Sequence, residues 1–296
     1  MVETMRVGAL HRFPVKSMRG ERLEACTIGA AGVVGDRAYA LVDEEDGRVA
    51  SAKNPRKWGA LLGFRASFVD EPVPGEPAPP ALIVLPDGSE TRTDAADVDA
   101  VLSKVLDRAV RLVDTPPEAG AFEEVWPDID GLAPEEFVTS TTVAHEEGSG
   151  DPVSAIPMGM FAPPGTFFDL STIHLLTTST LRKLGELASD ASFDVRRYRP
   201  NLLVDSPGDE FVENGWVGRR LALGDAAAVT VTLPTMRCVM TTLAQEELPR
   251  DRATLRAIAQ HNRVEIAGFG TWACAGAYAD VATPGEVRVG DPVTLA

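Results

Sequence analysis

The sequence predicts an α+β fold that is mainly β, built from two β-rich domains with only a few helices. Three observations support this prediction. The chain has 296 residues, more than the roughly 100–200 residues typical of one domain. Short apolar and β-branched runs recur in both halves of the chain, and turns rich in Gly, Pro and Asp separate them. Apolar residues at helical spacing occur in few segments.

The N-terminal region predicts a small antiparallel sheet or barrel. Strand-like runs lie at residues 6–13, 22–28, 37–43 and 61–69, and turn sequences at 16–20, 29–35 and 43–47 separate them. Regular spacing of short strands is typical of such a fold. We therefore expect a barrel-like domain to begin near the N-terminus.

Residues 71–114 continue this domain after an exposed loop. The run EPVPGEPAPP at residues 71–80 contains five prolines, which predict a stiff loop because proline donates no backbone hydrogen bond. Strands are expected at 81–85 and 109–113. Between them, residues 97–108 place Val98, Leu102 and Val105 on one face of a predicted helix. The first domain is thus predicted to span residues 1–114.

Residues 115–166 show no sustained hydrophobic period and collect Pro, Gly and acidic residues. They predict a long loop or interdomain crossover. Paired acids in this segment, such as Glu123 and Glu124, are expected to be solvated. Because so long a structureless stretch is unusual in a compact domain, the segment is expected to be functional or ordered by packing.

Residues 167–296 predict a second β-rich domain. Strands are expected at 173–177, 202–204, 221–223, 228–233, 278–281, 286–289 and 293–295. A helix is expected at 179–188. A second helix, carrying Leu255 and Ile258, is expected after Asp251, which suits an N-cap position.

Composition excludes several classes of function. The formal net charge of −16 argues against a nucleic-acid partner, because phosphate binding needs a clustered basic face. No apolar run approaches the roughly 20 residues of a membrane span, and the N-terminus lacks the pattern of a secretory signal. Three scattered cysteines without a C-x-x-C pair support neither a disulfide framework nor a zinc knuckle. A cytoplasmic protein without a membrane partner is therefore expected.

Cations are scarce in this chain, so their positions are informative. The positively charged candidates lie at turns or strand ends, where they can gather around one anion together with Ser17; they are Lys16, Arg37, Lys53, Arg199 and Arg237. Each cation alone is better explained as a solvated surface charge. Cys238 directly follows Arg237, and a neighbouring arginine can lower a thiol pKa. The alternative, which spacing alone favours, is that Cys238 packs as a small buried residue. Cys26 and Cys274 are expected to be structural.

Two groups of motifs resemble a known family. The sequence FPVKS at 13–17 and the run GVVGDRAY at 32–39 resemble the N-terminal β-barrel domain that precedes MOSC domains. Four later segments resemble the MOSC domain itself, which is named after the C-terminal domain of molybdenum cofactor sulfurase. They are RPN at 199–201, FVENGWVG at 211–218, RC at 237–238 and PGEVRVGD at 284–291. The resemblance covers nearly the whole chain in order, apart from the middle segment.

This resemblance implies a cofactor and a site. The family includes the mitochondrial amidoxime-reducing component and bacterial relatives that reduce N-hydroxylated compounds at a molybdenum–molybdopterin cofactor. By the resemblance, Cys238 is the metal ligand and the catalytic residue. Cofactor contacts are implied for the residues that match the motifs: Lys16, Ser17, Arg37, Lys53, Arg199, Asn201 and Arg237. Lys53 stands where the family usually has an arginine. No fused ferredoxin-like domain is present, so a separate electron-donor protein is expected beside a small-molecule substrate.

Three hypotheses follow. The first is a molybdenum-dependent oxidoreductase acting on N-hydroxylated or N-oxide substrates. In the second, the protein is a non-catalytic carrier of the cofactor or of sulfur on Cys238. The third is a β-rich protein with a structural cysteine and another ligand. The relatives often carry a D-P-x-T-G segment after the Arg-Cys pair, where this chain has LAQEELP at 243–249, so a different substrate side is expected.

Overall fold

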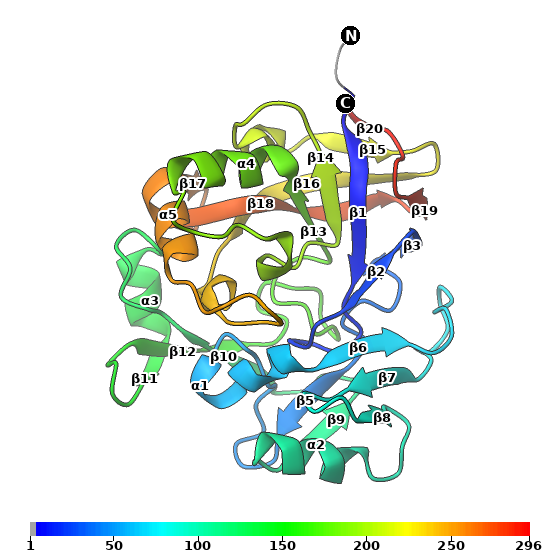
Figure 1. Ribbon diagram of the computed structural model, residues 1–296, viewed down its shortest axis with the longest axis vertical. Helices are drawn as coiled ribbons and strands as arrows, with labels where there is room; N and C mark the ends of the chain where they lie inside the picture. The colour runs from blue at the N-terminus through cyan, green and yellow to red at the C-terminus, as the bar shows by residue number, and fades with distance from the viewer. Residues whose placement is uncertain (1–3) are drawn as a thin grey trace.

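One large sheet joins the two ends of the chain in the computed structural model, which describes residues 4–296 (Figure 1). Its strands run in the order β2 (Glu21–Leu23), β1 (Arg6–Arg12), β14 (Leu202–Asp205), β13 (Ile173–Thr177), β18 (Gly270–Thr283), β16 (Ala227–Met236), β15 (Arg220–Leu223) and β20 (Val293–Leu295), while β17 (Arg263–Ile266) pairs with β18. Most neighbours are antiparallel; β13 and β14 are parallel.

This sheet closes into a barrel through the first strand. The backbone N–H of Val7 donates to the carbonyl of Asp291 at 2.9 Å, and that of Val293 donates to Met5 at 2.9 Å. Strand β1 therefore bonds to β14 on one side and to the segment leading into β20 on the other. Closure removes the exposed edges that an open sheet would present.

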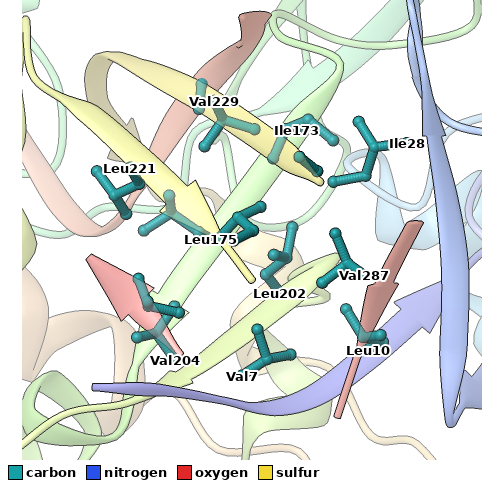
Figure 2. Close-up of a cluster of buried hydrophobic side chains, with 14 of the residues drawn as sticks. Val7, Leu10, Ile28, Ile173, Leu175, Leu202, Val204, Leu221, Val229 and Val287 are labelled. Atoms are coloured by element: carbon teal, nitrogen blue, oxygen red, sulfur yellow. The ribbon is translucent and has the colours of Figure 1, made fainter. Parts of the chain in front are cut away.

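The barrel interior combines residues from both ends of the sequence. Figure 2 shows Val7, Leu10 and Ile28 pointing into the same cluster as Ile173, Leu202 and the other labelled side chains of the C-terminal half. Ile28 lies on β3 (Ala25–Gly29), which pairs with β19 (Gly285–Arg288) and β4 (Gly32–Val33) in a small sheet beside the barrel. The N-terminal strands are therefore part of the C-terminal barrel core.

A second core belongs to the N-terminal half alone. It is formed by a three-stranded sheet, a two-stranded sheet and one helix, which lie at the lower end of the view in Figure 1. These elements are β6 (Arg65–Phe68), β7 (Ala81–Val84), β8 (Glu90–Arg92), β5 (Ala40–Asp43), β9 (Val110–Val113) and α2 (Val98–Leu106). The structure is thus mainly β with a few helices, as predicted.

The helices lie in different parts of the molecule, and two of them pack against strands of the barrel. The α-helices are α1 (Pro55–Trp58), α3 (Glu135–Thr141), α4 (Thr178–Leu187) and α5 (Ala253–His261), besides α2. Short 3₁₀ helices are η1 (Gly59–Gly63), η2 (Val195–Arg197), η3 (Val212–Trp216) and η4 (Val239–Thr242). Helices α4 and α5 contact each other and share a core with β17 and β18. Among residues 4–296, no helix has the length and apolar character needed to cross a bilayer.

The middle segment is not the loop that its lack of periodicity predicts. It forms a three-stranded sheet of β10 (Ala121–Val125), β12 (Pro152–Pro157) and β11 (Thr142–His145), with α3 packed against β12. Glu123 and Glu124 on β10 are 7% and 6% exposed, so the expectation that they are solvated is wrong. The strand was not predicted because its hydrophobic pattern is interrupted: two acidic residues, each paired with a cation, are buried where apolar residues would be expected.

Two further expectations were wrong in detail. Residues 61–63, the start of the strand expected at 61–69, belong instead to η1. This 3₁₀ helix buries the consecutive residues Leu61 and Leu62, whereas successive residues of a strand point to opposite faces. Helix α5 has Arg252, not Asp251, at its N-cap. The Asp251 carboxylate nevertheless accepts a hydrogen bond from the backbone N–H of Ala253 at 2.9 Å.

Candidate functional site

Most of the predicted site residues surround one cavity. It has a volume of about 100 Å³ and lies where the turns that follow β1 and β4 meet the ends of β16 and η2. Its lining includes all the predicted residues except Asn201: Lys16, Ser17, Arg37, Lys53, Arg199, Arg237 and Cys238. The cations come from both halves of the chain, so the fold brings together groups up to about two hundred positions apart in the sequence.

Lys16 and Ser17 are held rigidly in the turn that follows β1. The backbone N–H of Lys16 bonds to the Tyr39 carbonyl at 2.8 Å, and Ser17 Oγ accepts from the N–H of Ala52 at 3.0 Å. Lys16 Nζ donates to the Phe167 carbonyl at 2.7 Å and pairs with the Asp169 carboxylate. Burial lowers the pKa of Lys16, and Asp169 opposes this effect. The ammonium group is therefore fixed where it faces the cavity.

Arg37 and Arg199 lie on the same aromatic ring. Their guanidinium carbons lie 4.7 and 4.1 Å from the centroid of Phe13, which gives both cations a cation–π contact. Arg37 also pairs with Asp36. For the Arg199 guanidinium, no hydrogen-bond acceptor is present among residues 4–296, although the residue is only 9% exposed.

The environment of Arg199 disfavours its charge. Burial, together with the nearby Arg37, lowers the pKa of Arg199 to about 9. The guanidinium still carries its charge at neutral pH, since arginine does not release its proton in proteins under these conditions. Arg199 is thus a buried cation without a full counter-charge, and an anion entering the cavity would supply one.

Backbone strain is concentrated at the same place. Five non-glycine residues in the described part of the chain have positive φ angles, and three of these, Ser17, Arg37 and Arg199, line this cavity at φ 65°, 49° and 54°. Such conformations cost free energy and persist where surrounding contacts impose them. They occur disproportionately at functional sites, which supports the assignment of this cavity as the candidate site.

Cys238 follows β16 and is partly exposed to the cavity. Burial raises the pKa of its thiol to about 11, against the opposing charge of Lys53. Burial therefore outweighs the nearby positive charge at this thiol. The Arg237 guanidinium is engaged by the backbone, donating to the carbonyls of Ala275 at 2.7 Å and Tyr198 at 3.2 Å, and also to His174. Its role is to anchor the loop that carries Cys238.

Lys53 reaches the cavity as part of an ion-pair network. Its Nζ lies 3.0 Å from Glu124 and 3.3 Å from Asp169. Burial alone would lower the pKa of Lys53, but the two carboxylates outweigh it and hold the pKa well above its usual value. Lys53 thus stays charged beside Cys238.

Asn201 acts from behind the cavity. Its side-chain nitrogen donates to Asp36 Oδ2 at 2.9 Å, and its oxygen accepts from the backbone N–H of His174 at 3.1 Å. Asp36 in turn pairs with Arg37. Asn201 does not line the cavity, but through Asp36 it fixes the orientation of Arg37, which does.

Sequence reasoning missed several lining residues, among them Asp169, His174 and Tyr278. Asp169 places its carboxylate between Lys16 and Lys53, and these two cations hold its pKa well below the usual value although burial alone would raise it. His174 and Tyr278 also line the cavity, with ring centroids 5.7 Å apart. None belongs to a motif, and each reaches the site only through the fold. For Asp169, the only local signal in the sequence was a single acidic residue shortly before the strand at 173–177.

The other cysteines belong to packing clusters. Cys26 and Cys274 are 4% and 0% exposed and lie in separate hydrophobic cores. In the part of the chain that the structure describes, no group of three or more His, Cys, Asp or Glu residues is arranged to hold a metal ion. Cys238 is the cysteine that faces the cavity.

Comparisons with known proteins match both halves of the chain. The model of the MOSC domain matches residues 164–294, and that of the MOSC N-terminal beta barrel domain matches residues 4–60. The YUAD protein from Bacillus subtilis, known from a crystal structure, has 11% sequence identity to this chain. The superposition covers 99% of this chain and 96% of that chain, with a TM-score of 0.44. YiiM from Geobacillus stearothermophilus is 16% identical, with a TM-score of 0.30 over 43% of this chain and 54% of that chain. No curated protein matches the chain.

Proposed function

The chain belongs to the MOSC family, with a MOSC domain preceded by a MOSC N-terminal β-barrel domain, and we propose that it binds a molybdenum–molybdopterin cofactor and reduces N-hydroxylated or N-oxide substrates. In this proposal Cys238 ligates the metal. The electrons come from a separate donor protein, and the substrate is a small molecule.

One observation carries the proposal: a buried cation without a full counter-charge and a partly exposed thiol share one cavity. Within the described residues 4–296, the Arg199 guanidinium has no hydrogen-bond acceptor, and Cys238 faces the same space. A ligand that fits both must carry an anionic group at one end and a metal with affinity for sulfur at the other. Molybdopterin, with its terminal phosphate and its metal-binding dithiolene, has this combination.

Different residues would hold the phosphate and the metal of this cofactor. Lys16, Arg37 and Arg199 would surround the phosphate, and the hydroxyl of Ser17 would add a hydrogen bond. Cys238 would release its proton on ligation, because the thiolate is the form that binds metals. The phosphate would compete with Asp169 for Lys16. When bound, the cofactor would supply the two-electron chemistry that cleaves the N–O bond, with two protons taken up and water released.

The remaining lining would shape the substrate position. Phe167, Phe168 and Met236 contribute apolar surface to the cavity, which limits the access of water to the reacting bond. Neutral His174, held by Arg237 and by the Arg199 carbonyl, fixes two segments that carry cofactor contacts. These residues orient and shield, while the redox chemistry belongs to the cofactor.

The proposal is tested by expressing the protein in a host that makes molybdopterin and measuring its molybdenum, its pterin and its reduction of benzamidoxime with an artificial electron donor. We expect stoichiometric metal and turnover. Cys238→Ala should lose the metal, and Arg199→Ala should lose pterin while the fold remains intact. Cys26→Ala and the exposed Arg256→Ala serve as matched controls that keep both.

The outcomes separate the alternatives. Protein without metal and pterin from such a host would overturn the proposal. Stoichiometric cofactor without reduction of any N-hydroxylated substrate would contradict the enzyme and indicate the carrier function instead.

A further inference from the structure

An aromatic pocket adjoins the cavity that contains Cys238. Its volume is about 60 Å³, which is several times the space that one water molecule needs. The same six side chains line both spaces: Lys53, Asp169, Leu170, Met236, Arg237 and Tyr278. A small molecule that enters the Cys238 cavity can therefore extend into the aromatic pocket.

One wall of the aromatic pocket comes from the middle segment of the chain. The two family models match residues 4–60 and 164–294, so this segment lies outside both of them. Strands β10 and β12, helix α3 and the residues that follow these strands supply the wall: Phe122, Glu124, Trp126, Phe137, Ile156 and Phe161. The pocket is thus built partly from a segment that the two domain models do not describe, where ligand specificity can differ from one chain to another.

The aromatic rings of the pocket hold one another in place. The ring of Phe137 meets those of Trp126 and Trp272 edge to face, with centroids 5.9 and 5.0 Å apart. The indole N–H of Trp126 donates to Ser154 Oγ at 2.8 Å, and that of Trp272 donates to the Phe269 carbonyl at 2.7 Å. Because both N–H groups have acceptors, the rings offer the pocket apolar surface, which suits a planar apolar group.

Glu124 adds a hydrogen-bond acceptor to this apolar lining. The residue is 6% exposed, and its Oε2 accepts from Lys53 Nζ at 3.0 Å. No donor reaches the other oxygen, Oε1, from any residue between 4 and 296. A buried acceptor without a donor costs free energy, and a ligand that brings a donor recovers it. An apolar pocket with one such polar group is the usual form of a small-molecule site.

We infer that the aromatic pocket binds the organic part of the substrate, and that Glu124 selects substrates in which an N–H group stands beside an aromatic ring. The inference deepens the proposed function and rests on it. The ring would lie against Phe137 and Trp272, and the N–H group would donate to Glu124 Oε1. Compounds with a carboxylate at this position are disfavoured, because their charge would face Glu124 and Asp169.

The first arm of the test measures binding to the cofactor-free protein. Benzamide and acetophenone are nearly equal in size and differ in an NH₂ or a CH₃ group beside the carbonyl. Titration followed by tryptophan fluorescence should show that benzamide binds about tenfold or more tightly, as expected for a hydrogen bond to a charged group. Absent binding of benzamide, or equal binding of the two compounds, would overturn the inference.

Variants assign this preference to Glu124. In Glu124→Gln, Lys53 retains the side-chain oxygen and the amide nitrogen faces the pocket, so the preference for benzamide should disappear. Glu123→Gln alters the neighbouring buried acid, which does not line the pocket, and as the matched control should keep the preference. Phe161→Ala, at a half-buried residue outside the helices and strands, should weaken the binding of both compounds. An unchanged preference in Glu124→Gln, or unchanged affinities in Phe161→Ala, would contradict the assignment.

The second arm uses protein from a molybdopterin-producing host. Benzamidoxime and acetophenone oxime are both N-hydroxylated and again differ in an NH₂ or a CH₃ group. With unchanged metal content, Glu124→Gln should lower kcat/KM for benzamidoxime about tenfold and leave that for acetophenone oxime nearly unchanged. Equal changes for both oximes would overturn the inference and leave the proposed function intact. Protein that prefers benzamide but contains no molybdenum would instead contradict the proposed function, so the two failures are distinguishable.

Discussion

Arg199 is the side chain at which the candidate site most clearly destabilises the folded protein. Its backbone lies at φ 54°, and its guanidinium is buried against Phe13, with no hydrogen-bond acceptor in the part of the chain that the structure describes. A charge in such a place destabilises the empty protein, and a bound anion offsets that cost. Function and stability are therefore expected to respond in opposite directions when the charge is removed.

Replacing Arg199 by Met, which keeps the length and the apolar contact, tests this expectation. The melting temperature of the cofactor-free protein should rise by about 2–4 °C, as for a gain of about 1 kcal/mol. Phosphate affinity, measured by calorimetry, should fall about tenfold or more. Arg256→Met on the exposed face of α5 is the control. A lower melting temperature with unchanged phosphate binding would show that the cation is structural.

His174 gives the site a defined dependence on acid. Burial and the charge of Arg237 lower the pKa of His174 well below its usual value of 6.5. The folded protein thus holds this ring neutral, and the unfolded chain binds its proton first as the pH falls. The contribution to stability is fully present above pH 6.5 and is lost below it.

Urea unfolding at a series of pH values measures this effect. As the pH falls from 7 to 5, protonation of His174 in the unfolded chain should lower the free energy of unfolding. His174→Gln, whose side-chain oxygen can accept from Arg237, should be less stable at pH 7 but should lack this part of the pH dependence. Parallel pH profiles for the two proteins would contradict the assignment of a neutral histidine.

Residues that short local motifs single out lie together in the structure, while their roles in the site stay predictions. Lys16, Arg37, Arg199 and Cys238 lie in short local patterns, and the structure brings them to one cavity. Asp169 was missed because its role depends on Lys16 and Lys53, which lie more than a hundred positions away in the sequence. A local pattern cannot show such a pairing.

Strand β18 supports the framework of the site. It runs from Gly270 to Thr283 and pairs with β13, β16 and β17. Gly276, at φ 86°, lies at its centre, where a Cβ atom would approach the Leu175 carbonyl oxygen to 2.5 Å and His174 Nε2 to 2.8 Å. Glycine is required here both by the backbone angle and by the close contact.

Gly276→Ala should therefore destabilise the protein by about 3 kcal/mol or more, since it combines backbone strain with overpacking against backbone atoms. Gly185, within α4, has open space around it, so Gly185→Ala should stabilise the protein by about 0.5–1 kcal/mol. Chemical denaturation of the two variants measures both effects. Similar stabilities for the two alanine variants would contradict the packing described around β18.

Elements with regular patterns were predicted well, and those with buried charges were not. The strand at 173–177 and the helix at 179–188 agree with β13 and α4 to within one residue. Strand β10 was missed because Glu123 and Glu124 are buried in ion pairs with Arg48 and Lys53. Burying acidic residues becomes possible only when partners arrive from elsewhere in the chain.

On the scale of the whole molecule, the two halves are interlocked rather than simply linked. Strand β1 closes the C-terminal barrel, and β3 pairs with β19 near the C-terminus (Figure 1). The turn after β1 then carries Lys16 and Ser17 into the cavity that contains Cys238. The division at residues 114 and 167 stays a prediction, since the barrel core draws on residues from both sides of it.

This interlocking explains how cations from one half come to face a thiol from the other. The central claim is that the sulfur of Cys238 ligates molybdenum in the cavity that both halves enclose. X-ray absorption at the molybdenum edge, on protein from a molybdopterin-producing host, tests this most directly. We predict one sulfur neighbour fewer around the metal remaining in Cys238→Ser than in the unaltered protein. An identical sulfur shell in the two proteins, or no molybdenum in the unaltered one, would contradict it.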